Sequence, residues 1–183
     1  MKNLKNNFLK YCLEKKLQIN DNQIKVINLL NEYYNNCFKK KFFSYIFKNK
    51  SNKIGFYLFG DVGVGKTMLL NFFFENLKIK KKRVHFNEFM INFHEFVHKR
   101  KEIDKSNSID AFVKRFKEEC ELVYFDEFQV TNIVDAMILG KLFKRIFEEK
   151  IKVIFTSNIS INNLYKDGLQ RDQFIPFIKI LEK

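Results

Sequence analysis

The chain has 183 residues, 46% of them hydrophobic, with 23 Phe, 6 Gly and 1 Pro, so it can form one domain with a real core and few disordered linkers. A formal charge of +13 permits nucleic acid or an anionic membrane surface as a partner, but the basic residues are spread along the chain, as AT-rich coding also produces. The three cysteines are far apart in the sequence, which argues against a disulfide framework and favours a reducing compartment. The N-terminus has no continuous apolar run of the kind that a secretory signal has. No stretch approaches about 18 successive apolar residues, so no membrane span is expected.

The first 50 residues are predicted to be helical and basic. Leu4, Phe8 and Cys12 recur at helical spacing. A second apolar stripe follows Asp21, the expected N-cap, and includes Val26, Ile27, Leu30, Tyr33, Tyr34 and Cys37. Because the pattern changes to alternating strands and helices at about residue 51, we divide the chain into a helical N-terminal segment, 1–50, and a core, 51–183.

A phosphate-binding loop is predicted between an apolar strand, 54–59, and a helix that opens with Met68. The loop has the pattern G-x-x-x-x-G-K-T and consists of Gly60, Asp61, Val62, Gly63, Val64, Gly65, Lys66 and Thr67. Its glycines let successive backbone N–H groups point into one concavity, and the helix N-terminus adds partial positive charge. Lys66 can reach the β- and γ-phosphates, and the Thr67 hydroxyl can ligate Mg²⁺. The pattern therefore predicts a nucleoside triphosphate site.

Beyond this loop the chain alternates between predicted strands and helices. Strands are expected at 83–87, 121–125 and 152–157, and helices at 88–100, 109–119 and 133–147, with a loop at 105–108. Strands separated by helices imply a parallel sheet with right-handed crossovers. We therefore expect the α/β class, with a parallel sheet flanked by helices.

Two further strand ends carry side chains that suit a nucleotide site. Asp126 and Glu127 come directly after LVYF, and Asn158 follows KVIFTS. Ligands of open α/β sheets bind at the carboxyl ends of the strands. Asp126 is therefore expected to hold Mg²⁺, Glu127 to activate a water near the γ-phosphate, and Asn158 to contact that phosphate or that water. Asn158 taken alone is equally compatible with a turn cap.

A second motif, His94-Glu95-Phe96-Val97-His98, matches the zinc-peptidase pattern H-E-x-x-H in a predicted helix. Its two histidines would share a helix face and bind zinc, with Glu95 as general base. The helix is already needed as the crossover after RVHF, and acids that might complete the ligand set are frequent in this chain. Zinc peptidase activity is therefore kept only as a remote alternative.

The chain resembles the AAA+ ATPases of the ZapE and mitochondrial Afg type in its motifs GDVGVGKT, RVHFNEFM, LVYFDEFQVTNIVDAMILGKLF, TSN and LYKDGLQRDQFIPFI. The resemblance extends from about Asp21 to the C-terminus, and FDEFQVT and GLQR are more diagnostic than the phosphate loop. It implies an AAA+ core that hydrolyses ATP with Mg²⁺, has the sheet order 5-1-4-3-2 and self-associates. The family's roles carry over onto Lys66, Thr67, Asp126, Glu127 and Asn158. Arg171 of GLQR falls where an arginine finger would point at a neighbouring subunit's γ-phosphate, although a surface arginine after a turn fits equally well.

The resemblance also sets expectations about what surrounds the core. In the family a fifth strand and a helical lid domain would follow Lys183, so we expect the strand order 1-4-3-2, the 54–59 strand at an edge, and no lid. The resemblance implies remodelling of an unidentified protein client, in cell division or membrane-protein quality control. It places the protein in the cytoplasm or an organellar matrix, and contact with the inner membrane stays open.

The main interpretation is an ATPase that converts ATP to ADP and phosphate. The alternative is a nucleotide-switched binding module without efficient turnover, associated with nucleic acid through its basic charge. The expected absence of a lid favours this alternative, because the lid couples hydrolysis to subunit motion in the resembled family.

Overall fold

The computed structural model describes residues 3–38, 54–100 and 105–182. Its helices are α1 (Leu4–Glu14), α2 (Asp21–Phe38), α3 (Lys66–Glu75), α4 (Phe86–Lys99), α5 (Lys105–Glu119), α6 (Ile133–Glu148) and α7 (Arg171–Leu181), with a short 3-10 helix, η1 (Ile161–Asn163). Its strands are β1 (Gly55–Phe59), β2 (Lys81–His85), β3 (Leu122–Asp126) and β4 (Lys152–Ser157). No helix within the described ranges is long and apolar enough to cross a membrane.

The four strands form one parallel sheet in the order β1-β4-β3-β2, which confirms the predicted order. Phe59 is in register with Ser157, and His85 is in register with Asp126. The carboxyl ends of the four strands therefore meet at one end of the sheet. Each strand-to-strand connection contains at least one helix, as parallel neighbours require.

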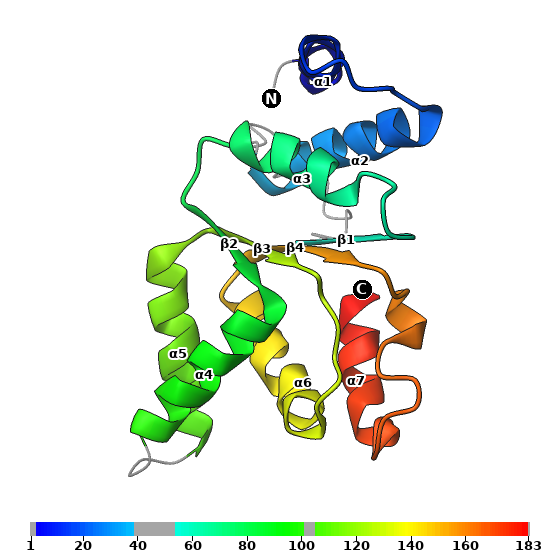
Figure 1. The fold of residues 1–183 in the computed structure, drawn as a ribbon. Coiled ribbons are helices and arrows are strands. Elements are labelled where there is room, and N and C mark those ends of the chain that lie inside the picture. Colours follow the sequence, from blue (N-terminus) through cyan, green and yellow to red (C-terminus); the bar gives the residue numbers. More distant parts are fainter. Residues whose placement is uncertain (1–2, 39–53, 101–104, 183) are drawn as a thin grey trace, which may run out of the picture.

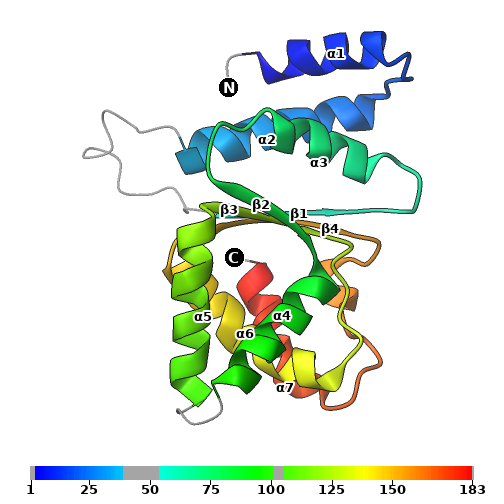
Figure 2. The same ribbon diagram turned by 60° about the vertical axis from the view of Figure 1, so that its left-hand side comes forward.

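Helices cover both faces of the sheet, as Figure 1 shows. Helices α1, α2 and α3 lie on one face, and α4, α5, α6 and α7 lie on the other; the rotated view in Figure 2 shows the same separation. This three-layer arrangement confirms the predicted α/β class. The division at residue 50 stays a prediction, because residues 39–53 lie outside the described residues.

The sheet separates two apolar clusters. On the α1–α3 side, the N-terminal helices pack with α3 against Leu122, Tyr124 and Ile154 of the sheet. On the other side the core is strongly aromatic: the ring centroid of Phe128 lies 4.5 Å from that of Phe86 and 4.6 Å from that of Phe155. Edge-to-face pairs of this kind add to the free energy of burial. Both faces of the sheet are thus packed, which fixes the positions of the strand ends.

Two predicted boundaries were wrong. The loop expected at 105–108 is the first turn of α5, because Phe112, Val113 and Phe116 anchor this helix in the core and tertiary packing overrides weak local propensity. The strand expected at 83–87 is β2, which runs from Lys81 to His85. Its last two expected residues start α4, since Phe86 turns into the core as the first helical residue.

The expected N-cap of α2 was also wrong by one residue. The Asn20 side chain accepts a hydrogen bond from the Gln23 backbone N–H at 2.9 Å, and Gln23 Oε1 accepts one from the Asn20 N–H at 3.3 Å. This reciprocal pair is a capping box, in which Asn20 is the cap. Asp21 is instead the first helical residue, where its negative charge favours the helix N-terminus.

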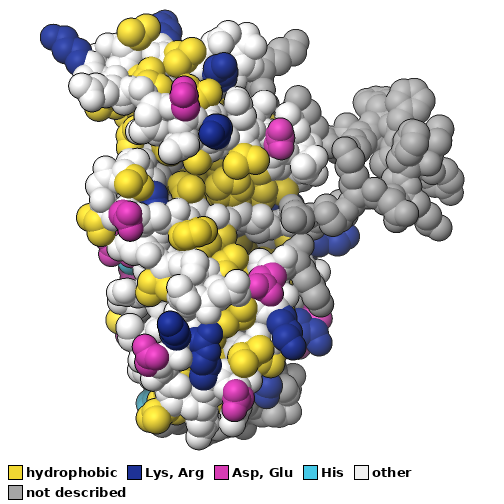
Figure 3. All heavy atoms as spheres, turned by 90° about the vertical axis from the view of Figure 1, so that its right-hand side faces the viewer, with side chains coloured by type: hydrophobic (Ala, Val, Ile, Leu, Met, Phe, Trp, Pro, Cys, Tyr) yellow, Lys and Arg dark blue, Asp and Glu magenta, His cyan; other side chains and the backbone are white. Residues whose placement is uncertain are grey.

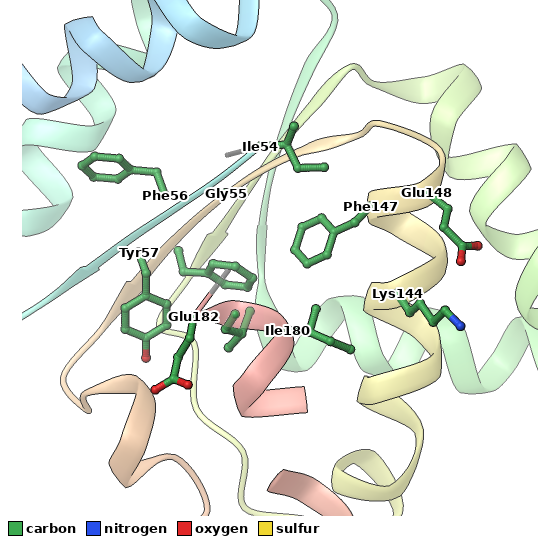
Figure 4. Close-up of a pocket in the computed structure, with 11 residues that line it drawn as sticks. Ile54, Gly55, Phe56, Tyr57, Lys144, Phe147, Glu148, Ile180 and Glu182 are labelled. Atoms are coloured by element: carbon green, nitrogen blue, oxygen red, sulfur yellow. The ribbon is translucent and has the colours of Figure 1, made fainter. Parts of the chain in front are cut away.

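Strand β1 lies at an edge of the sheet and, within the described residues, pairs with β4 alone. Beside it is a cavity of about 520 Å³, lined by β1 and by the ends of α6 and α7. Figure 4 shows Tyr57, Phe147 and Ile180 lying around this cavity. The cavity adjoins the amino-terminal part of β1, and no phosphate-loop residue lines it, so it is distinct from the predicted nucleotide site.

Candidate nucleotide site

The phosphate loop connects the end of β1 to the start of α3, the context that the motif requires. Gly63 and Gly65 have φ angles of +84° and +87°, which side chains with a Cβ rarely adopt. A Cβ at Gly65 would also lie 3.3 Å from Nε2 of Gln23 on α2, so the glutamine side chain would have to shift slightly. The backbone conformation therefore explains the glycine before Lys66 in the motif, and also the glycine at position 63, which the motif leaves variable.

Lys66 joins the loop to the end of β4. Its ammonium group donates hydrogen bonds to the carbonyl oxygens of Gly60 and Asp61, both at 2.7 Å, and to Oδ1 of Asn158 at 2.9 Å. The structure therefore brings together two of the predicted site residues that are 92 positions apart. Thr67 lies beside Lys66 in the first turn of α3 and is exposed.

Asp126 is the last residue of β3 and only 4% exposed. Its Oδ1 accepts hydrogen bonds from the hydroxyls of Thr156, at 2.6 Å, and Tyr124, at 3.1 Å, while its Oδ2 accepts one from the Arg83 guanidinium. Burial raises the pKa of Asp126, but the bonds from Thr156, Arg83 and Tyr124 outweigh it and lower this pKa below its ordinary value. The carboxylate is therefore ionised at neutral pH, as a ligand of Mg²⁺ must be.

Glu127 has a φ angle of +54°, in the left-handed region that non-glycine residues rarely occupy. Its backbone N–H donates to Thr156 Oγ1 at 3.1 Å, and the next N–H, of Phe128, donates to the Thr156 carbonyl at 2.7 Å. Its side chain is 77% exposed, with Oε2 3.9 Å from Nδ1 of His85. Strained backbone of this kind concentrates at functional sites. Here it accompanies a carboxylate that points toward the solvent.

Arg171 is the first residue of α7. Its guanidinium donates to the carbonyl oxygens of Leu164 at 3.0 Å and Asn162 at 2.8 Å, both in its own chain. In the segment that precedes Arg171, Tyr165 and Gln170 have positive φ angles, of 53° and 56°. The structure thus gives Arg171 a bracing role, and its role as an arginine finger stays a prediction.

His94 of the H-E-x-x-H motif is engaged with another helix. Its Nε2 lies 2.6 Å from Oδ1 of Asp135 on α6. Among the described residues no group of three or more His, Cys, Asp or Glu side chains is placed to hold a metal ion. The zinc-peptidase alternative therefore gains no third ligand, whereas Mg²⁺ commonly keeps several waters and needs only one or two carboxylates.

Three polar residues around Asp126 were not identified from the sequence. Tyr124 shares a face of β3 with Asp126 by strand alternation, and Arg83 is in register with Tyr124 on the neighbouring strand. Thr156 comes from β4 on the other side. Strand alternation would have indicated Tyr124, but the strand order had to be combined with exact register to find Arg83 and Thr156.

The parallel sheet, the phosphate loop and the acidic strand end define a P-loop NTPase. Solved structures with this fold include that of DnaI, with a TM-score of 0.55 and 21% identity over 92% of this chain and 83% of that one. The structure of the DnaC helicase loader has a TM-score of 0.53 and 14% identity, over 90% of this chain and 88% of that one. At these identities the likeness establishes the fold.

The family follows from the sequence. The AFG1-like ATPase family profile matches residues 6–183, and the chain belongs to this family. Lactation elevated protein 1 homolog B of Danio rerio is 44% identical over 139 residues, which are 70% of this chain and 28% of that protein. Cell division protein ZapE of Escherichia coli K12 is 39% identical over 130 residues, 70% of this chain and 34% of ZapE. The chain thus corresponds to about a third or less of each relative's length.

Proposed function

We propose that the protein binds Mg-ATP at the carboxyl end of its sheet and hydrolyses it to ADP and phosphate. The observation that carries this proposal is the set of Lys66 contacts, which tie the phosphate loop to Asn158 at the end of β4. The neighbouring strand β3 ends in Asp126 and continues into Glu127, so every predicted catalytic group except Arg171 lies at this end of the sheet. Membership of the AFG1-like ATPase family supports the same activity.

Each residue has a role that its geometry permits. The loop N–H groups and Lys66 would hold the phosphates, with the lysine exchanging its carbonyl partners for phosphate oxygens. Oxygen ligands from Thr67 and Asp126 suit Mg²⁺, which would neutralise charge on the phosphates. Glu127 would orient and deprotonate the attacking water. Its side chain is exposed, and the hydrogen bonds from the N–H groups of Glu127 and Phe128 to Thr156 fix its backbone. Asn158 would contact the γ-phosphate or that water.

The wider role is proposed from the relatives. One of them is named as a cell division protein, so we propose a role in cell division, in which an oligomer of this chain would use ATP hydrolysis to remodel a protein client. The cytoplasm or an organellar matrix, with peripheral contact to the inner membrane, fits this role. On the face in Figure 3, described Lys and Arg side chains lie scattered among Asp and Glu side chains and do not form one basic patch.

A nucleotide-switched binding module is the second candidate. The observation that favours it is the engagement of Arg171 with its own chain, because a guanidinium held at Leu164 and Asn162 is not delivered to a neighbour. In such a module ATP would bind without efficient turnover. Binding and turnover must therefore be measured separately.

Replacing Lys66 by Ala is expected to weaken ATP binding about a hundredfold or more, because the loop loses its cation for the β- and γ-phosphates. The measurement is titration of the purified protein with a fluorescent ATP analogue in the presence of MgCl₂. Lys78→Ala, which removes the same charge from an exposed position in the turn after α3, is the matched control and is expected to bind like the unmodified protein. Equal affinity in Lys66→Ala and the control would refute the assignment of the site.

A further inference from the structure

Arg83 is placed as the counter-ion of Asp126. It lies on β2 in register with Tyr124, its guanidinium carbon is 5.3 Å from the centre of the Tyr124 ring, and one of its nitrogens donates to Asp126 Oδ2. The Asp126 side chain is 5% exposed and that of Arg83 is 37% exposed. The guanidinium therefore covers the buried carboxylate from the solvent side.

The two oxygens of Asp126 are used differently. A carboxylate offers about four lone-pair sites, two on each oxygen. Oδ1 accepts from both Thr156 and Tyr124 and is filled, whereas Oδ2 accepts from Arg83 alone. Oδ2 thus keeps one acceptor site for a metal ion or its bound water, directly beside the site that the guanidinium uses.

A cation at this position has a physical reason. An ionised carboxylate that is nearly buried is strongly destabilising without a partner. Arginine stays charged at every accessible pH, so it can hold such a carboxylate whenever no metal ion is present. The same charge repels an approaching Mg²⁺, because two cations a few ångströms apart at a protein surface oppose each other.

We propose that Arg83 is a positioning residue that holds the Asp126 carboxylate and whose positive charge opposes the binding of Mg²⁺ at Oδ2. Arg83 then sets the Mg²⁺ concentration at which the site fills. Its partly exposed side chain has a flexible stem that can turn away from the sheet when the metal ion arrives. This proposal rests on the proposed function for the identity of Asp126 as a metal ligand.

The experiment is a titration with MgCl₂ alone, followed by thermal unfolding of the whole chain, in Arg83→Gln and Arg83→Met. The unmodified protein is expected to show a Mg²⁺-dependent rise in Tm. Without Mg²⁺ both variants should unfold several degrees lower, because the buried carboxylate loses its counter-ion. Their half-saturating Mg²⁺ concentration should fall about tenfold, the size of one cation's repulsion after solvent screening. Arg83→Gln retains a donor for Oδ2 and keeps the test available if Arg83→Met does not fold.

Two controls separate this effect from a general loss of charge. Arg83→Lys retains a cation and is expected to need Mg²⁺ at a concentration near that of the unmodified protein. Lys82→Met removes a charge one residue away, from a side chain that pairs with Glu119 and lies over Phe116 on the opposite face of the sheet. The half-saturating Mg²⁺ concentration of Lys82→Met should equal that of the unmodified protein.

Several outcomes would overturn the proposal. A half-saturating Mg²⁺ concentration that is unchanged in Arg83→Gln would show that the guanidinium does not compete with the metal ion. A higher concentration would show that Arg83 assists metal binding instead. A Tm that responds to Mg²⁺ in none of these proteins would show that the site does not fill without nucleotide, so that Arg83 does not set the concentration at which it fills. This titration contains no nucleotide, whereas the Lys66 experiment measures ATP binding. Failure of the Arg83 proposal can therefore be distinguished from failure of the proposed ATP site.

Discussion

Replacing Glu127 by Gln is expected to leave ATP bound and to reduce turnover about a thousandfold, within the range that loss of a general base produces. The amide has nearly the shape of the carboxylate but cannot accept the proton of the attacking water. The Glu127 side chain is 77% exposed and lies beside His85 of β2, so ATP affinity should be unaffected. Phosphate release under saturating Mg-ATP measures turnover, and titration with the fluorescent analogue measures affinity.

Glu121→Gln is the matched control, because Glu121 is an exposed acid directly before the opposite end of β3. It should hydrolyse ATP at the rate of the unmodified protein. Undiminished turnover in Glu127→Gln would remove Glu127 from the role of general base. Tight binding without measurable turnover in the unmodified protein would instead favour the nucleotide-switched module.

Glu127→Gly is expected to be equally inactive and yet more stable than the unmodified protein. At a φ angle of +54° a residue with a Cβ loses about 1 kcal/mol, and glycine does not. Because glycine also gains freedom in the unfolded chain, the net rise in Tm should be about 2 °C. Calorimetry of the two Glu127 variants measures it. A lower Tm in Glu127→Gly would mean that the side chain itself stabilises the fold.

Most of the fold was predictable because its signals are contiguous. The phosphate loop lies between an apolar strand and a helix, and β4 was predicted with its observed ends, 152–157, because KVIFTS is a compact β-branched and aromatic run. Helix α5 was predicted four residues short because its first turn, KSNS, is polar and has no apolar helical pattern. The packing of the later, apolar residues of the helix in the core stabilises this turn.

The candidate site was predictable to the same extent. Gly60 to Thr67, Asp126, Glu127 and Asn158 lie at the end of a strand or in the segment after it, so a local motif identifies them. The Arg83 and Thr156 contacts to Asp126 depend on register across three strands, which one-dimensional patterns do not contain, whereas strand alternation alone would have indicated Tyr124. The strained φ angle of Glu127 is likewise a consequence of the β3–β4 hydrogen bonds around Thr156 and has no local sequence signal.

Replacing Arg171 by Ala is expected to reduce turnover about a thousandfold if its guanidinium serves a neighbouring subunit, as arginine fingers do. The variant also loses the hydrogen bonds to Leu164 and Asn162, so Tm should fall as well, by several degrees. A decrease in turnover therefore does not by itself separate the finger from the brace. Arg115→Ala, which removes an exposed arginine from α5, controls for the lost charge.

Mixing two inactive variants separates the two roles. Lys66→Ala cannot bind ATP but retains Arg171, whereas Arg171→Ala binds ATP but lacks the guanidinium. If Arg171 acts between subunits, an equal mixture should recover roughly a quarter of the normal turnover, because half of the subunits bind ATP and half of these have a Lys66→Ala neighbour. If Arg171 only braces its own chain, each defect stays within its own subunit and the mixture remains inactive. Recovery would also require that the guanidinium leave Leu164 and Asn162 on assembly, so the hydrogen bonds seen here would belong to the unassembled subunit.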